Sequence, residues 1–548
     1  MIFNTAKNQV WNVVHAQGHP EYVTLVGRNA SNRNYIPDRH QSKRHMGQPN
    51  ILFLIWDSCR VDSARRCAST LSDLGLSGHS FSNAIAPATW SLPSHASLFT
   101  GQQPHEHGRV CLTDDLTTVD LPARLSERGY TTYGVSANGF ASFKTGFADG
   151  FDEFWYTGGE EPYTEGLGVY EFVHRRRRTH PDATTRQLMA ALASSLVTHK
   201  HPFKSTVNLA ATVAGKAARR FEPLQRIPHT IFAANNSYSY HPAKNTTTIE
   251  HVLEREARTD RPFFLFANYM DPHRPYRPEG YLDGEGGQSA ARATVERLND
   301  NIADPWQFIR AVETDHPDPD PDDIETLRQF YADEVRRADR ELSRLLARLR
   351  QLNLFEETII VVTADHGENL GETDEMGRQR FGHEASISDA LVRVPLVVHY
   401  PTLSGETVEK YVSLTDLYNL FTAEALGDAL DKGRLPDVFA TDGPVTAQYP
   451  AVGGEELYEK YPDVPKDTLA HRVERHSVAG YVSGYRLVVE SDGTERAWAD
   501  GKKVPVKTVP DELYERCRAN IDELATRDAS HESLTQSERD RLEALGYL

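Results

Sequence analysis

The run Asn50-Ile-Leu-Phe-Leu-Ile55, followed by Trp56-Asp57, decides the fold of this chain. The run is short and continuously apolar rather than alternating, which is typical of a strand covered on both faces by helices. A second run of this kind, Thr358-Ile-Ile-Val-Val-Thr363, opens into Ala364-Asp365-His366-Gly367-Glu368. We therefore predict an α/β fold with a large mixed, mainly parallel sheet flanked by helices.

The residues that follow the two runs are typical of a metal site. In parallel sheets ligands collect beyond the carboxyl ends of the strands, so Asp57 and the pair Asp365-His366 should lie at one edge. Two carboxylates and an imidazole make a mixed oxygen and nitrogen site that suits a divalent cation. Such an ion lowers the pKa of a coordinated hydroxyl or polarises a substrate oxygen.

The hydroxyl is expected from Ala88-Thr-Trp-Ser-Leu-Pro-Ser-His-Ala-Ser-Leu-Phe-Thr-Gly101, in which Ser91 is the candidate nucleophile. Pro93 suits the first turn of a helix that begins around Leu92, because its fixed φ fits that turn and its missing N–H needs no partner there. An anionic ester would then meet free backbone N–H groups beside Ser91.

Each motif alone has a purely structural interpretation. A lone aspartate after a strand is usually a turn or cap residue, and Ser-x-Pro-Ser alone is commonly a helix cap. The order of the motifs favours chemistry: a strand and Asp57, then the Ser91 segment, then a strand and Asp365-His366-Gly367-Glu368. We therefore interpret the set as a metal-activated hydroxyl.

In these motifs the chain resembles the sulfatases of the alkaline phosphatase superfamily, over most of residues 49–401. Asp57-Ser-Cys-Arg60 is similar to the first metal motif of the family, and Ser91-Leu-Pro-Ser94 with Thr100-Gly101 is similar to its nucleophile signature. The remaining matches are Phe263-Phe-Leu-Phe-Ala-Asn-Tyr-Met-Asp-Pro-His273-Arg-Pro-Tyr276, Asp365-His366-Gly367-Glu368, Gly382-His383-Glu384 with Arg393-Val-Pro-Leu396, and the terminal Leu545-Gly-Tyr-Leu548.

The resemblance implies an alkaline phosphatase-like fold and a metal-dependent hydrolase that cleaves sulfate esters. It makes Ser91 both the nucleophile and a ligand of one divalent ion, with the further ligands Asp57, Asp365 and His366. The resemblance implies that this ion is calcium. It gives His273 and His383 the task of binding substrate or assisting proton transfer, although each histidine alone would also suit a loop position. The implied substrate is a small anionic ester or a sulfated glycan.

Three departures from the family pattern shape these expectations. His95 stands where the machinery that oxidises the nucleophile to formylglycine reads an arginine, so we expect an unmodified Ser91. Ser58 replaces a second aspartate, which moves the metal preference from calcium towards manganese or zinc. Gly134-Val-Ser-Ala-Asn138 replaces a Gly-Lys-Trp-His segment, so that Ser136 or Asn138 would serve as neutral donors.

A plain serine leaves other functions open. An esterified serine must be attacked by water or by a second alcohol. The alternative to a sulfatase is therefore a phosphodiesterase, or a transferase of phospho or sulfo groups, that uses unmodified Ser91. A non-catalytic anion-binding relative is a third class, and it predicts an anion pocket without turnover.

Composition indicates an acidic, well-hydrated surface. The chain has a formal charge of −18 over 548 residues, and arginine outnumbers lysine. Such a surface is typical of salt-adapted proteins, so the chain resembles a haloarchaeal variant of the family, and we expect activity to need salt. The charge also argues against nucleic-acid binding. The four cysteines show no CxxC spacing and form no metal-ligand set.

The motifs divide the chain into three parts. We predict an arm at 1–48, a catalytic α/β domain at 49–401 with insertions at about 158–250 and 279–325, and a smaller carboxyl-terminal α+β part at 402–548. Apolar residues at helical spacing predict a helix over 324–352. The run Arg175-Arg-Arg-Arg178 suits a solvated helix face or a contact with an anionic polymer.

No segment of the sequence predicts export or membrane insertion. The amino terminus lacks a basic start followed by an apolar core. The apolar stretch Leu188–Val197 is about half the length that a bilayer requires. We therefore expect no membrane span and a cytoplasmic protein.

Overall fold

The structure is a computed structural model. It describes residues 48–526 except 112–113, 159–160, 162, 164–165, 181, 221–239, 280–288, 302–319, 374–378, 384–385, 402, 423–434, 436–437, 440–442 and 452–474. The predicted arm lies almost entirely outside the described residues, as does the carboxyl-terminal motif.

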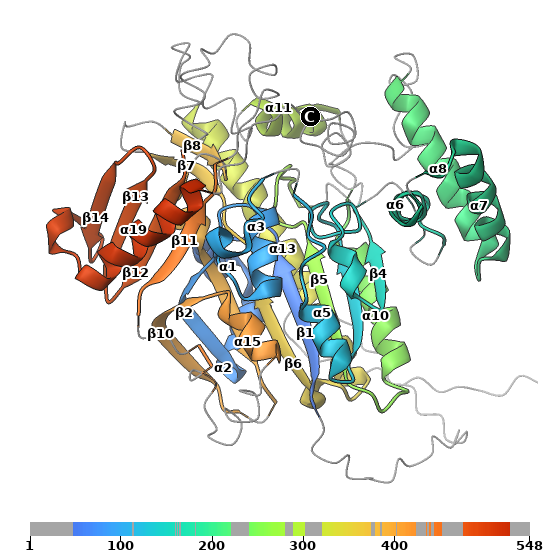
Figure 1. The fold of residues 1–548 in the computed structure, drawn as a ribbon, viewed down its shortest axis with the longest axis horizontal. Helices are drawn as coiled ribbons and strands as arrows, with labels where there is room; N and C mark the ends of the chain where they lie inside the picture. Colours follow the sequence, from blue (N-terminus) through green and yellow to red (C-terminus); the bar gives the residue numbers. More distant parts are fainter. Residues whose placement is uncertain are drawn as a thin grey trace, which may run out of the picture. The chain divides into compact units, whose positions relative to one another are not determined.

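One mixed sheet of eight strands forms the centre of the fold (Figure 1). Its strands, in spatial order, are β10 (Glu406–Ser413), β2 (His79–Ile85), β9 (Arg393–His399), β6 (Thr358–Thr363), β1 (Asn50–Trp56), β5 (Phe263–Tyr269), β3 (Thr131–Ser136) and β4 (Glu153–Tyr156). Only the two pairings of β9 are antiparallel. The predicted fold class is therefore confirmed.

The three central strands end at the same level. Ile55 of β1 pairs with Asn268 of β5 on one side and with Thr363 of β6 on the other. All residues of these strands are buried, as expected from their continuous apolar runs. The residues that follow them therefore meet at one edge of the sheet.

Helices cover the sheet in two groups. The first group is α1 (Val61–Cys67), α2 (Ser69–Ser77), α10 (Ala243–Glu256) and α13 (Pro321–Gln351), in which α13 contacts the other three. The second group is α3 (Ser91–Thr100), α5 (Leu121–Glu127) and α15 (Asp416–Thr422), which contact one another. Figure 1 shows the second group in front of the sheet and α13 behind it. None of the described helices has the length and apolar character needed to cross a membrane.

Aromatic side chains attach α3 to the sheet. Phe99 of α3 packs edge-on against Phe266 of β5 at 5.0 Å and lies 6.0 Å from Phe53 of β1, between ring centroids. Gly101 caps the end of the helix; its φ is 72°, and an added Cβ would lie 2.9 Å from the Tyr418 ring. Glycine is therefore required where the chain turns away, and the start of the helix is held over the sheet edge.

The carboxyl-terminal part contains a separate antiparallel sheet. Its strands are β11 (Val445–Tyr449), β12 (Ser477–Val482), β13 (Tyr485–Glu490), β14 (Glu495–Ala499) and β15 (Lys502–Val504), and α19 (Asp511–Thr526) packs on it. Leu513 and Cys517 of α19 share a core with Val478 and Leu487 of the sheet. Strand β10 belongs to the large sheet although it follows residue 401.

Helices account for most of the described residues of the two insertions. The first carries α6 (Val169–Thr179), α7 (Thr185–Thr198) and α8 (Pro202–Arg220), which contact one another, and runs into α10. The second carries α11 (Ser289–Asn301). Beyond it, a two-stranded ribbon of β7 (Asn369–Thr373) and β8 (Gln379–Gly382) stands apart from the large sheet.

Candidate active site

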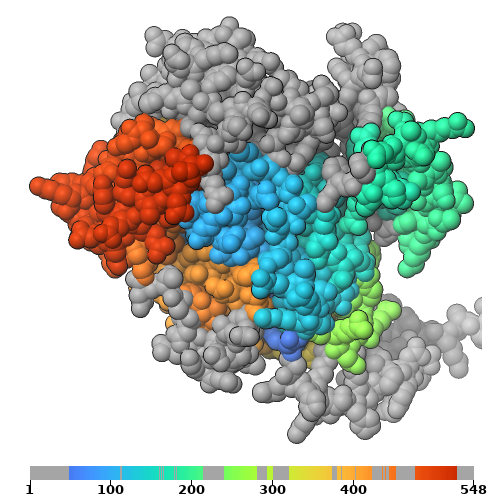
Figure 2. All heavy atoms as spheres, in the orientation of Figure 1, coloured from blue at the N-terminus to red at the C-terminus, as the bar shows by residue number. Residues whose placement is uncertain are grey.

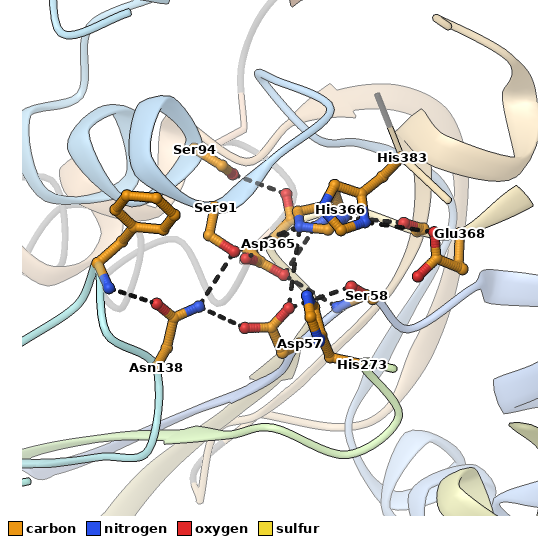
Figure 3. A network of polar contacts seen from close by, with 12 residues as sticks. Asp57, Ser58, Ser91, Ser94, Asn138, His273, Asp365, His366, Glu368 and His383 are labelled. Atoms are coloured by element: carbon orange, nitrogen blue, oxygen red, sulfur yellow. Dashed lines mark hydrogen bonds and ion pairs between the residues drawn. The ribbon is translucent and has the colours of Figure 1, made fainter. Parts of the chain in front are cut away.

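Asp57, Asp365 and His366 meet at the carboxyl edge of the large sheet (Figure 3). Asp57 follows β1 and the other two follow β6, and all three side chains are fully buried. One ligand atom from each lies within 4.8 Å of the others. The structure thus brings together the three residues that sequence reasoning selected as metal ligands.

The two carboxylates repel each other in this buried setting. Burial, together with the charge of Asp365, raises the pKa of Asp57 to about 6. Burial also acts to raise the pKa of Asp365, but His366 and His95 outweigh it and hold that pKa below its usual range. Oδ2 of Asp365 is buried and has no hydrogen-bond partner in the part of the chain that the structure describes. A buried pair of like charges with an orphaned oxygen fits a divalent cation.

The imidazole of His366 is oriented as a ligand. Its Nδ1 lies 2.8 Å from the carbonyl oxygen of Gly367, which can only accept, so Nδ1 carries the proton. Nε2 then presents its lone pair 3.8 Å from Oδ1 of Asp57 and 3.5 Å from Oδ2 of Asp365. A ring held by a backbone carbonyl on one nitrogen and open on the other is the usual arrangement of a metal-binding histidine.

Ser91 is the first residue of α3 and faces the same three side chains. Its Oγ lies 3.4 Å from Nε2 of His366. Asn138, just after β3, donates from Nδ2 to Ser91 Oγ at 3.0 Å and to Oδ2 of Asp57 at 2.5 Å. Its own Oδ1 accepts the backbone N–H of Phe140 at 2.7 Å, which fixes the amide orientation. Asn138 therefore links the candidate nucleophile to the candidate metal ligands.

The helix start itself supports a negative charge on Ser91. Helix α3 begins at Ser91 without a side-chain cap, so its first backbone N–H groups have no capping partner among the described residues. The partial positive charge at this end favours an alkoxide or a bound anion. The predicted helix is confirmed, with its start at Ser91 rather than near Leu92.

His95 lies on α3 one turn after Ser91 and is fully buried. Its Nδ1 lies 2.8 Å from the Ser91 carbonyl oxygen and 3.7 Å from Oδ2 of Asp365, and its Nε2 lies 3.3 Å from the Asn268 amide. Sequence reasoning treated His95 only as a missing arginine. Its spacing of four residues from Ser91 on one helix was the signal that could have placed it beside the site.

Two further histidines line up beside His366. The ring centroid of His383 lies 4.5 Å from that of His366, and the centroid of His273 lies 5.4 Å from that of His383. Nδ1 of His383 lies 3.3 Å from Oε1 of Glu368. Figure 3 shows the three rings and Glu368 on the same side of the site. Both histidines chosen from the sequence therefore lie in the site.

Glu368 holds this row of rings and was not among the predicted site residues. Burial acts to raise its pKa, but His383, His273 and His366 outweigh it and lower that pKa to about 2. Glu368 is therefore ionised at working pH. Burial and the nearby His383 lower the pKa of His273 to about 4, so this ring is neutral at pH 7 when the site is empty.

A buried group of two arginines and two carboxylates shapes the loop that carries His273. Arg277 of this loop donates from its backbone N and its Nε to Oε1 of Glu334 on α13, at 2.9 and 2.8 Å. Arg337, also on α13, bonds Glu334 and lies 3.4 Å from Oδ1 of Asp271. Because Asp271 and Arg277 flank His273, this group fixes the loop to α13.

The comparisons with known proteins agree with this geometry. The sulfatase family profile matches residues 49–423, more than half of the chain. An ulvan-active sulfatase of Formosa agariphila is 24% identical over 454 residues, covering 80% of this chain and 70% of the relative. An N-acetylglucosamine-6-O-sulfatase of Bacteroides thetaiotaomicron is 22% identical and covers 80% of this chain and 77% of the relative.

Solved structures show the same fold. Ps i-CgsB, crystallised with k-i-k-neocarrahexaose, matches with a TM-score of 0.53 at 17% identity, covering 91% of this chain and 98% of the other. A phosphonate monoester hydrolase of Agrobacterium radiobacter matches with a TM-score of 0.52 at 17% identity, covering 89% and 98%. The chain therefore belongs to the sulfatase family and is a hydrolase of ester bonds, with sulfuric esters as the supported class.

Proposed function

We propose that the protein hydrolyses sulfate esters with unmodified Ser91 as the nucleophile and a divalent cation held by Asp57, Ser91, Asp365 and His366. One observation carries the proposal: the Ser91 hydroxyl begins a helix and points at two buried carboxylates and the open nitrogen of His366. When bound, the cation supplies the charge that lets the hydroxyl lose its proton near neutral pH.

The residues of the chain account for the first chemical step. Ser91 Oγ forms a bond to the sulfur of the ester while the bond from sulfur to the leaving oxygen breaks. Asn138 holds the nucleophile in line through its bond to Oγ. The N-terminus of α3 and a protonated His383 offset the negative charge of the transferred group.

His383 gives the leaving oxygen its proton, whereas His273, which is neutral at pH 7, binds the substrate. The ionised Glu368 provides a countercharge to a protonated His383 at 3.3 Å. His273 keeps Nδ1 at 2.6 Å from the carbonyl oxygen of Arg274, so its Nε2 is the nitrogen available to the substrate. Water then attacks the seryl ester and releases sulfate, which restores Ser91.

We further propose a sulfated glycan as the substrate class. Two relatives that match most of this chain are named for ulvan and for N-acetylglucosamine-6-O-sulfate. An alternative, hydrolysis or transfer of phosphoesters, is supported by the plain serine and by the neutral donor Asn138 where family members carry charged groups. The two functions differ in the ester that the site prefers, a sulfate or a phosphate.

Two variants test the nucleophile and the site. Ser91→Ala and Asp365→Asn should each lower turnover of 4-nitrophenyl sulfate by about 10⁴-fold or more, because each removes a member of one catalytic unit. Ser69→Ala, at an exposed serine of α2, is the control and should retain full activity. Turnover by Ser91→Ala near the wild-type rate would exclude Ser91 as nucleophile.

The state of Ser91 and the choice of anion need their own measurements. Intact-protein mass spectrometry should give the mass that the sequence encodes, whereas a deficit of two hydrogens would show formylglycine. Rates on aryl sulfate, phosphate monoesters and phosphate diesters, each with calcium, manganese or zinc, decide between sulfatase and phosphoesterase. A preference for a phosphate ester would contradict the proposed sulfatase.

A further inference from the structure

A cleft with a cavity volume of about 470 Å³ lies between the edge strand β4 and helix α6 of the first insertion. This volume is in the range of sites that bind small molecules or a few sugar rings. Figure 2 shows the helices of this insertion at the surface of the molecule. The cleft contains none of the proposed catalytic residues, so it is distinct from the site described above.

Several aromatic side chains line the cleft. Phe143, Trp155 and Tyr156 form its sheet side, and Tyr163 lies on the insertion side with 36% of its surface exposed. Phe143 packs edge-on to Tyr156, with ring centroids 5.5 Å apart. Flat aromatic faces with polar tips bind the apolar faces of sugar rings while their hydroxyl groups stay solvated.

Positive charge also reaches this cleft. Arg175 and Arg176 of α6 line it and are exposed. Two glutamates line it as well, but both are engaged within the protein. Glu171 pairs with Arg175 at 3.0 Å, and Oε1 of Glu161 accepts the backbone N–H of Val169 at 2.7 Å. Arg176 is therefore the arginine best placed to meet an anionic group.

The cleft lies on the same sheet edge as the catalytic site. Tyr156 ends β4 and pairs with Ser136 at the end of β3, two residues before Asn138. Phe143 follows Asn138 by five residues, so their Cα atoms are at most about 18 Å apart. A chain of a few sugars could therefore occupy both places.

We propose that this cleft is a binding subsite for a distal, sulfated part of a glycan chain whose sulfate ester is cleaved at Ser91. Sugar rings stack on Tyr163 and Tyr156, and a sulfate group of the chain pairs with Arg176. The inference rests on the proposed function for the reaction, but the binding itself can be measured without turnover. Of the two interpretations that the sequence allows for the four-arginine run, it favours contact with an anionic polymer.

Binding is tested in the full chain carrying Ser91→Ala, so that no ester is cleaved. The probes are oligosaccharides of dextran sulfate, chondroitin sulfate and carrageenan, and neutral dextran is the uncharged control. Titration calorimetry measures the affinity for each probe. Adding Tyr163→Ala or Arg176→Ala should weaken binding of the preferred sulfated probe by about tenfold each. Arg177→Ala removes the same charge from the next position of α6, outside the cleft, and should change binding by less than about twofold.

Turnover separates the cleft from the catalytic site. With Ser91 intact, Tyr163→Ala and Arg176→Ala should lower kcat/KM on the sulfated oligosaccharide and leave 4-nitrophenyl sulfate unchanged. Equal losses for Arg176→Ala and Arg177→Ala, or no binding to any sulfated probe, would overturn the subsite. If the wild type turns over no sulfate ester but the binding pattern holds, only the proposed function fails.

Discussion

At the residue scale, Asp57 and Asp365 place two buried negative charges side by side. Neither charge has a full cation partner among the described side chains, and Asp57 has its pKa raised to about 6 by burial and by Asp365. The protein thus keeps an arrangement that lowers its own stability. Function, rather than folding, explains such a pair.

The first prediction concerns this pair. Because the folded-state pKa of Asp57 lies above the ordinary value of 3.8, stability falls as pH rises to about 6, and the full cost is present at pH 7. In metal-free protein at pH 7, Asp57→Asn should raise the free energy of unfolding by about 2–3 kcal/mol. Thermal melts with chelator check this. With added divalent metal the wild type should gain more stability than the variant, and a metal-free variant that melts lower would contradict the account.

The second prediction concerns His273. Its folded-state pKa of about 4 lies below the ordinary 6.5, so the unfolded chain binds the proton first as pH falls. The wild type should therefore lose stability relative to His273→Gln between pH 6.5 and 4, by about 2 kcal/mol. Melting temperatures of both proteins at each pH give the difference in stability. Groups that titrate alike in the two proteins do not contribute to this difference. A constant difference over this range would refute it.

Much of the site could be predicted from single residues. Asp57 and Asp365-His366 follow continuous apolar runs, and parallel strands end at one edge, so their meeting followed from the pattern. His95 and Glu368 were missed for physical reasons. The place of His95 depends on the rotation of α3 about its axis, and the contact of Glu368 with His383 depends on how the β7–β8 ribbon folds back.

At the element scale, α13 supports the loop after β5. Glu334 of this helix is fully buried, and although burial acts to raise its pKa, Arg277 and Arg337 outweigh it and lower that pKa to about 2. Burial and the charge of Glu334 raise the pKa of Asp271 well above its usual range. The helix thus supplies the charge that holds the His273 loop in place.

The third prediction concerns the loss of the Glu334 charge. Glu334→Gln keeps the shape of the side chain but leaves two buried arginines short of a counterion, which should cost about 3–5 kcal/mol. It should also lower kcat on aryl sulfate, because His273 loses its support. Glu325→Gln makes the same change at an exposed position of α13 and should alter the melting temperature little. Equal melting temperatures of the two variants would show that the buried group is not needed.

Helix ends were less predictable than helices. The apolar period predicted a helix over 324–352, and the structure has α13 from Pro321 to Gln351. The earlier start follows from Asp320, whose side chain accepts the backbone N–H of Asp322, and from a proline in the first turn. The helix therefore begins inside a stretch of sequence that is rich in aspartate and proline.

At the scale of the whole molecule, net charge dominates. A formal charge of −18 repels itself and also repels anionic esters. At the catalytic edge the N-terminus of α3 favours a bound anion locally. We infer that added salt has two opposite effects. It reduces the repulsion between the surface charges, and it weakens the attraction of an anionic ester to the site.

The fourth prediction follows from the surface. Raising NaCl from about 0.1 to about 1 M shortens the screening length from about 10 to about 3 Å, so the melting temperature at pH 7 should rise by about 5 °C or more. The same titration near the isoelectric pH is the control and should give a smaller rise. A melting temperature that does not depend on salt at pH 7 would show that self-repulsion is not limiting.

The order of strands in the large sheet also has a consequence for synthesis. Strand β6 lies directly beside β1 in space but follows it by about three hundred residues in sequence. A nascent chain that has emerged only as far as α13 still lacks the neighbour on one side of its first strand, and it lacks Asp365 and His366. Chemical competence is therefore acquired late, after about two thirds of the polypeptide have left the ribosome.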